Sequence, residues 1–141
     1  MMIRAFKIED LDQVMQIWLE SNLEAHHFIN REYWVANAPM VKEQLLDAEI
    51  YVYEHESKIV GFVGLQDNYL AGIFVDKSMR SKGIGKQLLD YAKELREELL
   101  LTVYHENESA VKFYKREGLT TISQEMDEVT NKLELLMQYK A

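Results

Sequence analysis

A short basic segment rich in glycine carries the residue types best suited to chemistry. It reads Arg80-Ser81-Lys82-Gly83-Ile84-Gly85-Lys86. The segment follows an apolar run and opens an amphipathic one, which indicates a turn from a buried strand into a helix. Unpaired backbone N–H groups and the positive end of the dipole make such a helix start attractive to anions. The two glycines let the main chain approach a ligand, and the three basic side chains add donors, so the segment predicts a pyrophosphate site.

Three kinds of phosphate loop compete for this segment. A nucleoside triphosphatase loop needs serine or threonine where Gln87 stands, and a dinucleotide loop needs a third glycine where Leu88 stands. The remaining pattern, Gln/Arg-x-x-Gly-x-Gly/Ala, fits at Arg80, Gly83 and Gly85. A second motif, Asn-x-x-Ala-x-x-Phe-Tyr, begins 22 residues after the last of these glycines and spans residues 107–114.

Together the two motifs resemble the coenzyme A loop and the following helix of the GCN5-related N-acetyltransferase superfamily. The run continues through Gly118 and Leu119 in the family's manner, and the order of expected elements agrees over nearly the whole chain. The stretch 18–34 further resembles a small bacterial branch with lysine and amino-terminal acetyltransferases. The resemblance implies direct transfer of an acetyl group from acetyl-CoA to a primary amine through a tetrahedral intermediate. The alternative is a coenzyme A-binding or partner-binding module without turnover.

The resemblance also implies which residues hold the cofactor. Main-chain groups of Ile73, Phe74 and Val75 would bond the pantetheine arm, and the 80–86 segment would hold the pyrophosphate. Asn107 would contact the cofactor, although it also reads as a plain helix N-cap. Cysteine is absent, so no cysteine nucleophile or thiolate zinc site is available.

Tyr114 is the expected general acid, because a phenol can protonate a departing thiolate; the alternative is a tyrosine packed on an amphipathic helix. The base that collects the amine proton stays open. Candidates for the base or for the acceptor site are His26, His27, Tyr69, His105 and Glu106. The alternative for His26 and His27 is that they are ordinary loop histidines without a role in the site. The alternative for Tyr69 is that it is an aromatic residue that only caps the end of a strand. The four histidines lack metal-ligand spacing, so no metal is expected.

Composition limits the partners. The 141 residues carry a net charge of −8, which argues against nucleic acid and anionic membrane as partners. Residues 77–86 nevertheless hold four bases and no acid, a basic island suited to an anion. The amino terminus lacks the apolar core of a signal peptide, and no run approaches about 18 apolar residues, so a cytoplasmic location is expected. The acceptor stays open among protein lysine, protein amino terminus, polyamine and antibiotic, and the family implies a monomer or homodimer.

Hydrophobic periodicity predicts the elements that must position these groups. The length suits one domain, residues 1–141. Strands are expected at 3–6, 50–53, 59–65, 69–75, 99–104 and 133–139, with a further strand after Gly118. Helices are expected at 11–23, 85–97 and 107–117, and two short ones within 31–47, where Asn37 and Pro39 interrupt the pattern. The fold class is α/β with a mixed sheet flanked by helices, and the resemblance implies that the sheet splays at its centre.

Overall fold

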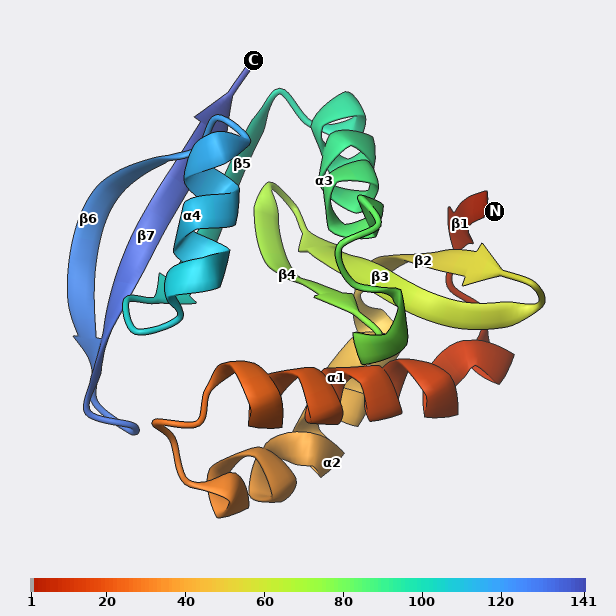
Figure 1. The fold of residues 1–141 in the computed structure, drawn as a ribbon, viewed down its shortest axis with the longest axis horizontal. Helices are drawn as coiled ribbons and strands as arrows, with labels where there is room; N and C mark the ends of the chain where they lie inside the picture. The colour runs from red at the N-terminus through yellow and green to blue at the C-terminus, as the bar shows by residue number, and fades with distance from the viewer. Residues whose placement is uncertain (1) are drawn as a thin grey trace.

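The apolar runs of the sequence form the strands of one mixed sheet, and the amphipathic runs form helices on its two faces (Figure 1). The computed structural model describes residues 2–141. The strands are β1 (Met2–Ala5), β2 (Glu49–His55), β3 (Lys58–Gln66), β4 (Tyr69–Val75), β5 (Glu98–Tyr104), β6 (Thr120–Asp127) and β7 (Lys132–Lys140). The helices are α1 (Leu11–Ala25), α2 (Arg31–Asp47), α3 (Ile84–Leu95) and α4 (Glu108–Arg116), with 3₁₀ turns η1 (Ile8–Asp10) and η2 (Lys77–Met79). The α/β prediction is confirmed, and outside the region 31–47 the predicted element ends lie within two residues of the observed ones.

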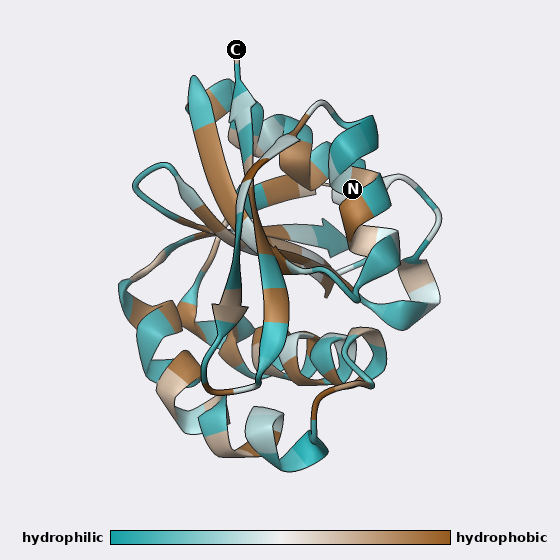
Figure 2. Cartoon of the chain, turned by 90° about the vertical axis from the view of Figure 1, so that its left-hand side faces the viewer, coloured by the Kyte–Doolittle hydropathy of each residue, from teal (hydrophilic) through white to brown (hydrophobic). Residues whose placement is uncertain are grey.

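Two apolar cores hold the helices to the sheet. On one face, Leu88 and Leu89 of α3 pack with Tyr114 of α4 over the strands. On the other face, α1 and α2 pack together, with Trp18 and Trp34 in edge-to-face contact at 6.0 Å between ring centroids. Figure 2 shows the apolar residues concentrated along the strands and hydrophilic ones along many outward helix turns. No helix within residues 2–141 is long and apolar enough to cross a membrane.

The sheet divides at its centre. Its strand order is β1-β2-β3-β4-β5-β7-β6, and only the β4–β5 pair is parallel. That pair is registered at a single position, Tyr69 opposite Leu100, whereas β5 stays paired with β7 along its whole length. Beyond Tyr69 the two strands diverge, which confirms the predicted splay. One edge of β4 therefore lacks a strand partner over most of its length.

The prediction of two short helices within 31–47 is wrong. One helix, α2, runs through Pro39. The amide of Asn37 donates to the Tyr33 carbonyl at 2.6 Å inside the helix, so this side chain does not cap a new one. Pro39 removes the hydrogen bond to the carbonyl of Val35, a residue on the exposed side of the helix. Trp34 and Leu45, buried before and after the proline, hold both halves against the core.

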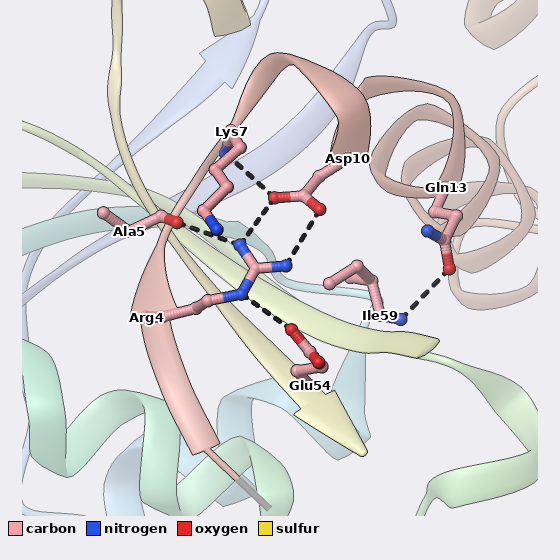
Figure 3. Close-up of polar contacts among 7 residues, drawn as sticks. All are labelled: Arg4, Ala5, Lys7, Asp10, Gln13, Glu54 and Ile59. Atoms are coloured by element: carbon pink, nitrogen blue, oxygen red, sulfur yellow. Dashed lines mark hydrogen bonds and ion pairs between the residues drawn. The ribbon is translucent and has the colours of Figure 1, made fainter. Parts of the chain in front are cut away.

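The first turn of α1 is tied to the sheet by a buried carboxylate (Figure 3). The guanidinium of Arg4 donates to both oxygens of Asp10, at 2.8 and 3.0 Å, and to Glu54 on β2 at 2.7 Å. Asp10 also accepts the backbone N–H of Lys7 at 2.9 Å, and the Arg4 hydrogen bonds hold its pKa below the usual range. In addition, Gln13 on α1 accepts the backbone N–H of Ile59 on β3 at 3.0 Å. These contacts fix the start of α1, whose far end reaches the divergence of β4 and β5 (Figure 1).

Candidate active site

The divergence of β4 from β5 opens a cavity of about 720 Å³. One wall is β4 with the segment that leads into α3, the facing wall is α4 with the turn before it, and the last turn of α1 closes the space (Figure 1). Its lining comes from the ranges 21–27, 73–75, 79–85 and 106–116. The cavity thus brings together segments that are far apart in the chain.

The glycine-rich segment lies where strand β4 has ended and helix α3 begins. Gly83 is the N-cap of α3 with a φ of +79°, a left-handed conformation that favours glycine. The backbone N–H of Gln87 makes the first intrahelical hydrogen bond, to the Gly83 carbonyl at 3.0 Å. The N–H groups of 84–86 precede this bond and have no acceptor within the helix. They form the positive end of the α3 dipole, and two of these residues, Ile84 and Gly85, line the cavity.

The absence of a side chain at Gly85 leaves space for a ligand to approach the main chain closely. A Cβ atom on Gly85 would lie 3.7 Å from the Phe113 ring and 3.9 Å from Val75. A side chain here would therefore narrow the gap between the two walls just above the helix start. The donor set of backbone N–H groups and one guanidinium, in a cradle that a Cβ would fill, fits a pyrophosphate.

Of the three basic side chains in this segment, only that of Arg80 belongs to the cavity lining. Its guanidinium donates to the carbonyl of Val75 at 3.3 Å and pairs with Glu24 of α1. Lys82 and Lys86 do not line the cavity. Lys86 instead pairs with Asp90 and Glu117, at 3.2 and 3.0 Å, and ties α3 to the end of α4. Of the three basic side chains predicted to bind the anion, only that of Arg80 thus lies in the cavity wall.

The open edge of β4 presents main-chain groups from alternate residues. Asp76 donates its N–H to Val60 on the β3 side at 2.7 Å, and the Phe74 oxygen also lies on that side, 3.0 Å from an ideal Cβ at Gly61. Because main-chain groups alternate in direction along an antiparallel pair, those of Ile73 and Val75 point away from β3. The resemblance implies that three residues, 73–75, bond the cofactor through their main chain. In the structure only two of them, Ile73 and Val75, face the open edge.

Asn107 is both a helix cap and part of the cavity wall. Its side-chain oxygen accepts the backbone N–H of Ala110 at 3.4 Å, at the start of α4. Its amide nitrogen lies 3.3 Å from Nε2 of His26. With the oxygen capping, the nitrogen donates and Nε2 accepts, which leaves the imidazole hydrogen on Nδ1. The Nδ1 atom is buried and has no hydrogen-bond partner within residues 2–141.

Three of the five candidates for the base or the acceptor site lie in different surroundings. His26 stacks on Trp34 at 5.1 Å, and burial lowers its pKa to about 4, so its ring is neutral near pH 7. His27 is exposed and lines the cavity. Tyr69 lies outside the lining, and its hydroxyl donates to Thr102 at 3.0 Å.

Tyr114 comes from the α4 wall and is 7% exposed. Burial, and then the nearby Tyr69, raise its pKa above the usual value, so the phenol keeps its proton at any physiological pH. The residue belongs to the apolar core and lines the cavity as well. It is therefore positioned as a hydrogen-bond or proton donor in a largely dry site.

Sequence reasoning missed the contribution of α1. Ser21, Asn22 and Glu24 line the cavity, but no motif marks them, because they arrive through the packing of α1. Phe113, the residue before Tyr114 in the second motif, packs against the core and also lines the cavity. Of the remaining base candidates, Glu106 lines the cavity and His105 does not. Within residues 2–141 no group of three or more His, Asp or Glu side chains is arranged to hold a metal ion.

Comparison with known proteins agrees with this geometry. Residues 47–119 match the model of the acetyltransferase (GNAT) domain. The peptidyl-lysine N-acetyltransferase YiaC of Escherichia coli is 35% identical over 119 residues, covering 83% of this chain and 82% of that protein. The E. coli peptidyl-lysine N-acetyltransferase YjaB is 31% identical over 136 residues, covering 95% and 92%. The solution structure of apo-form YjaB superposes with a TM-score of 0.88 at 28% identity, covering 98% and 96%.

The matched region contains the divergent strand pair, the glycine-rich segment and the whole of α4. The resemblance drawn from the two sequence motifs is confirmed. The chain belongs to the GNAT family of acetyltransferases.

Proposed function

We propose that the chain is an N-acetyltransferase that moves the acetyl group of acetyl-CoA to the side-chain amine of a lysine in a protein or peptide. One observation carries the proposal: a single cavity gathers an anion-binding helix start, an open strand edge and a protonated phenol. Each is a different requirement of acetyl transfer from a thioester carried on a nucleotide.

The residues for holding the cofactor follow from the geometry of the cavity. The backbone N–H groups of 84–86 and the guanidinium of Arg80 would hold the pyrophosphate. The main-chain edge of Ile73 and Val75 would bond the pantetheine arm as a neighbouring strand does. Asn107 would border the arm from the facing wall. When bound, acetyl-CoA supplies an acetyl group activated as a thioester.

Tyr114 would give its proton to the sulfur that leaves. A free thiol has a pKa of about 8.5 and a phenol about 10, so the two are close enough for transfer within hydrogen-bond distance. Burial raises the pKa of Tyr114 further, and the same dry surroundings raise that of a bound thiol. The phenol thus remains protonated until the sulfur takes the proton.

The acceptor must lose a proton before it attacks. With a pKa near 10.4, only roughly 0.04% of a lysine amine is neutral at pH 7. His27 is the candidate that collects this proton, because it lines the cavity and reaches solvent. His26 is better suited to positioning: its pKa of about 4 makes it a weak base, and it holds the Asn107 amide.

The choice of lysine rests on two points. Both E. coli relatives above 30% identity are named for peptidyl-lysine. The net charge of −8 also favours encounter with cationic acceptors. The charge favours any cationic amine, so the relatives are the reason that we propose a lysine side chain in preference to an amino terminus or a polyamine.

The test is release of free thiol from acetyl-CoA, with product mass measured alongside. The acceptors are an amino-terminally blocked peptide with one lysine, an unblocked peptide without lysine, and spermidine. We expect turnover with the first and little with the other two. Turnover with only the unblocked peptide or spermidine would contradict the lysine assignment. Coenzyme A binding without turnover on any acceptor would favour a binding module.

A further inference from the structure

One lysine of the chain itself, Lys132, lies beside a residue of the cavity lining. Lys132 begins β7, and its Nζ lies 3.8 Å from the carboxylate of Glu106. The same nitrogen lies over the ring of Phe28, 5.9 Å from the ring centroid. Glu106 is part of the cavity lining. An ammonium group is thus held by a carboxylate and an aromatic face beside the proposed active site.

Ring contacts and one hydrogen bond connect this ammonium to His26 and Asn107 of the cavity lining. The Phe28 ring lies against the ring of His26 at 5.6 Å and that of Tyr104 at 5.8 Å. His26 in turn reaches Asn107, the residue after Glu106. The contacts come from three separate parts of the chain: the α1–α2 connection, the β5–α4 turn and the β6–β7 hairpin.

The carboxylate of Glu106 and the ring of Phe28 together have the chemistry that recognises a primary ammonium. A carboxylate accepts its hydrogen bonds, and a ring face attracts its charge. Both side chains of the ion pair are partly exposed, 31% for Lys132 and 49% for Glu106, so another ammonium can replace the first. We propose that Glu106 and Phe28 form the subsite that receives the acceptor's ammonium, and that Lys132 fills it when no acceptor is bound.

This inference rests on the proposed lysine acetyltransferase function and adds a consequence to it. An incoming lysine competes with Lys132 for Glu106, so the chain's own side chain weakens acceptor binding. Removing the Lys132 charge should therefore improve acceptor binding without altering the cofactor site or the chemical step.

The experiment compares Lys132→Met, Glu106→Gln, the double variant and a control, Lys140→Met. Lys140 is an exposed lysine at the other end of the same strand, so its removal changes net charge equally. KM and kcat are measured with the blocked single-lysine peptide, and KM for acetyl-CoA with each variant. Calorimetry of the same peptide, and of its norleucine analogue, gives affinities that do not depend on turnover.

We expect Lys132→Met to lower the peptide KM roughly two- to five-fold, the factor that a partly exposed ion pair is worth. Its kcat and the KM for acetyl-CoA stay unchanged, as do all values in Lys140→Met. Glu106→Gln raises the peptide KM, by more in the Lys132→Met background than alone.

An unchanged or higher peptide KM in Lys132→Met overturns the inference, as does an equal fall in the control. Failure of the proposed function is separate, because it appears as no acetylated peptide from the wild-type chain. Calorimetry still decides the subsite in that case: Lys132→Met must bind the lysine peptide more tightly than wild type and the norleucine peptide equally. Equal affinity for the lysine peptide in both proteins overturns the inference.

Discussion

A buried phenol and a half-buried imidazole line the cavity, and burial shifts their pKa values in opposite directions. The pKa of Tyr114 rises, so the phenol stays protonated, whereas that of His26 falls to about 4, so the ring stays neutral. Both shifts follow from the cost of placing charge in a dry site. The phenol and the imidazole are therefore uncharged near neutral pH, whereas Arg80 and Glu24 of the same lining form an ion pair.

Replacing the phenol tests its role. We predict that Tyr114→Phe lowers kcat about 10²-fold or more, because the departing sulfur loses its proton donor. Coenzyme A affinity by calorimetry should stay within about two-fold, since phenylalanine preserves the packing. Tyr139→Phe, a hydroxyl removed on β7, serves as the control. Unchanged turnover in Tyr114→Phe would exclude it as the acid.

The neutral His26 predicts a particular pH dependence of stability. Between its ordinary pKa of about 6.5 and the folded value of about 4, the unfolded chain binds more protons than the folded one. Stability should therefore fall as pH drops through this window. His26→Phe keeps the stack on Trp34 and should flatten the dependence from pH 6.5 to 4, measured by denaturant unfolding. A slope in this range equal to that of wild type would show that His26 titrates normally.

At the residue scale, the sequence located the parts of the site that have local motifs. Residues 80–85 and 107–114 could be found because a glycine at a helix start and an asparagine N-cap are local features that neighbouring residues in the sequence reveal. Glu24 could not, because only the packing of α1 brings it to the cavity, and Phe28 could not, because only the fold places its ring beside Lys132. The outward direction of Lys86 likewise depends on Glu117, a partner on another helix.

Two glycines with positive φ allow the helix start to be tested separately from backbone strain. Gly83 (φ +79°) begins α3, and Gly118 (φ +96°) follows α4; neither has an atom within 4 Å of an ideal Cβ. Alanine at either position should cost about 1 kcal/mol of stability through strain alone. We predict that only Gly83→Ala also weakens coenzyme A binding, measured by calorimetry. Equal loss of affinity in Gly118→Ala would mean that strain acts through the whole fold.

The start of α1 depends on one carboxylate. Asp10→Asn should lower the free energy of unfolding by about 2 kcal/mol at pH 7, because Asp10 is buried and accepts three charge-assisted or backbone hydrogen bonds. The Arg4 hydrogen bonds depress the Asp10 pKa, so its stabilisation is present above the ordinary value near 4 and is lost as pH falls through the folded value. Denaturant unfolding at pH 7 and pH 3 checks this. The variant and wild type should differ less at pH 3, and an equal difference at both would contradict the ion-pair account.

At the element scale, strands were easier to place than the long second helix. The predicted bounds of the strand 69–75 agree with the observed ones, because a short apolar run between two turns is typical of a buried strand. For α2 the sequence predicts two helices separated near Pro39, because proline favours the first turn of a helix, but the structure has one helix. Burial of Trp34 and Leu45 outweighs the lost hydrogen bond, and that balance lies in tertiary packing.

Across the whole molecule, one break in the sheet creates the site. Each strand pair elsewhere runs in register over several residues, but β4 and β5 meet only at Tyr69 and Leu100. The main-chain groups of Ile73 and the N–H of Val75 are thereby left for a ligand beside the start of α3, while the Val75 carbonyl accepts from Arg80. Occupation of this edge would join the two halves of the sheet.

Residue-resolved amide hydrogen exchange, with and without saturating coenzyme A, tests this arrangement most directly. The N–H groups of Ile73 and Val75 face the open edge, and those of 84–86 precede the first bond of α3. We predict that these slow markedly on adding coenzyme A, while Phe74, which already faces β3, changes little. If Ile73 and Val75 exchange as fast with the ligand as without it, the cofactor does not bind along β4 and the proposed site is wrong.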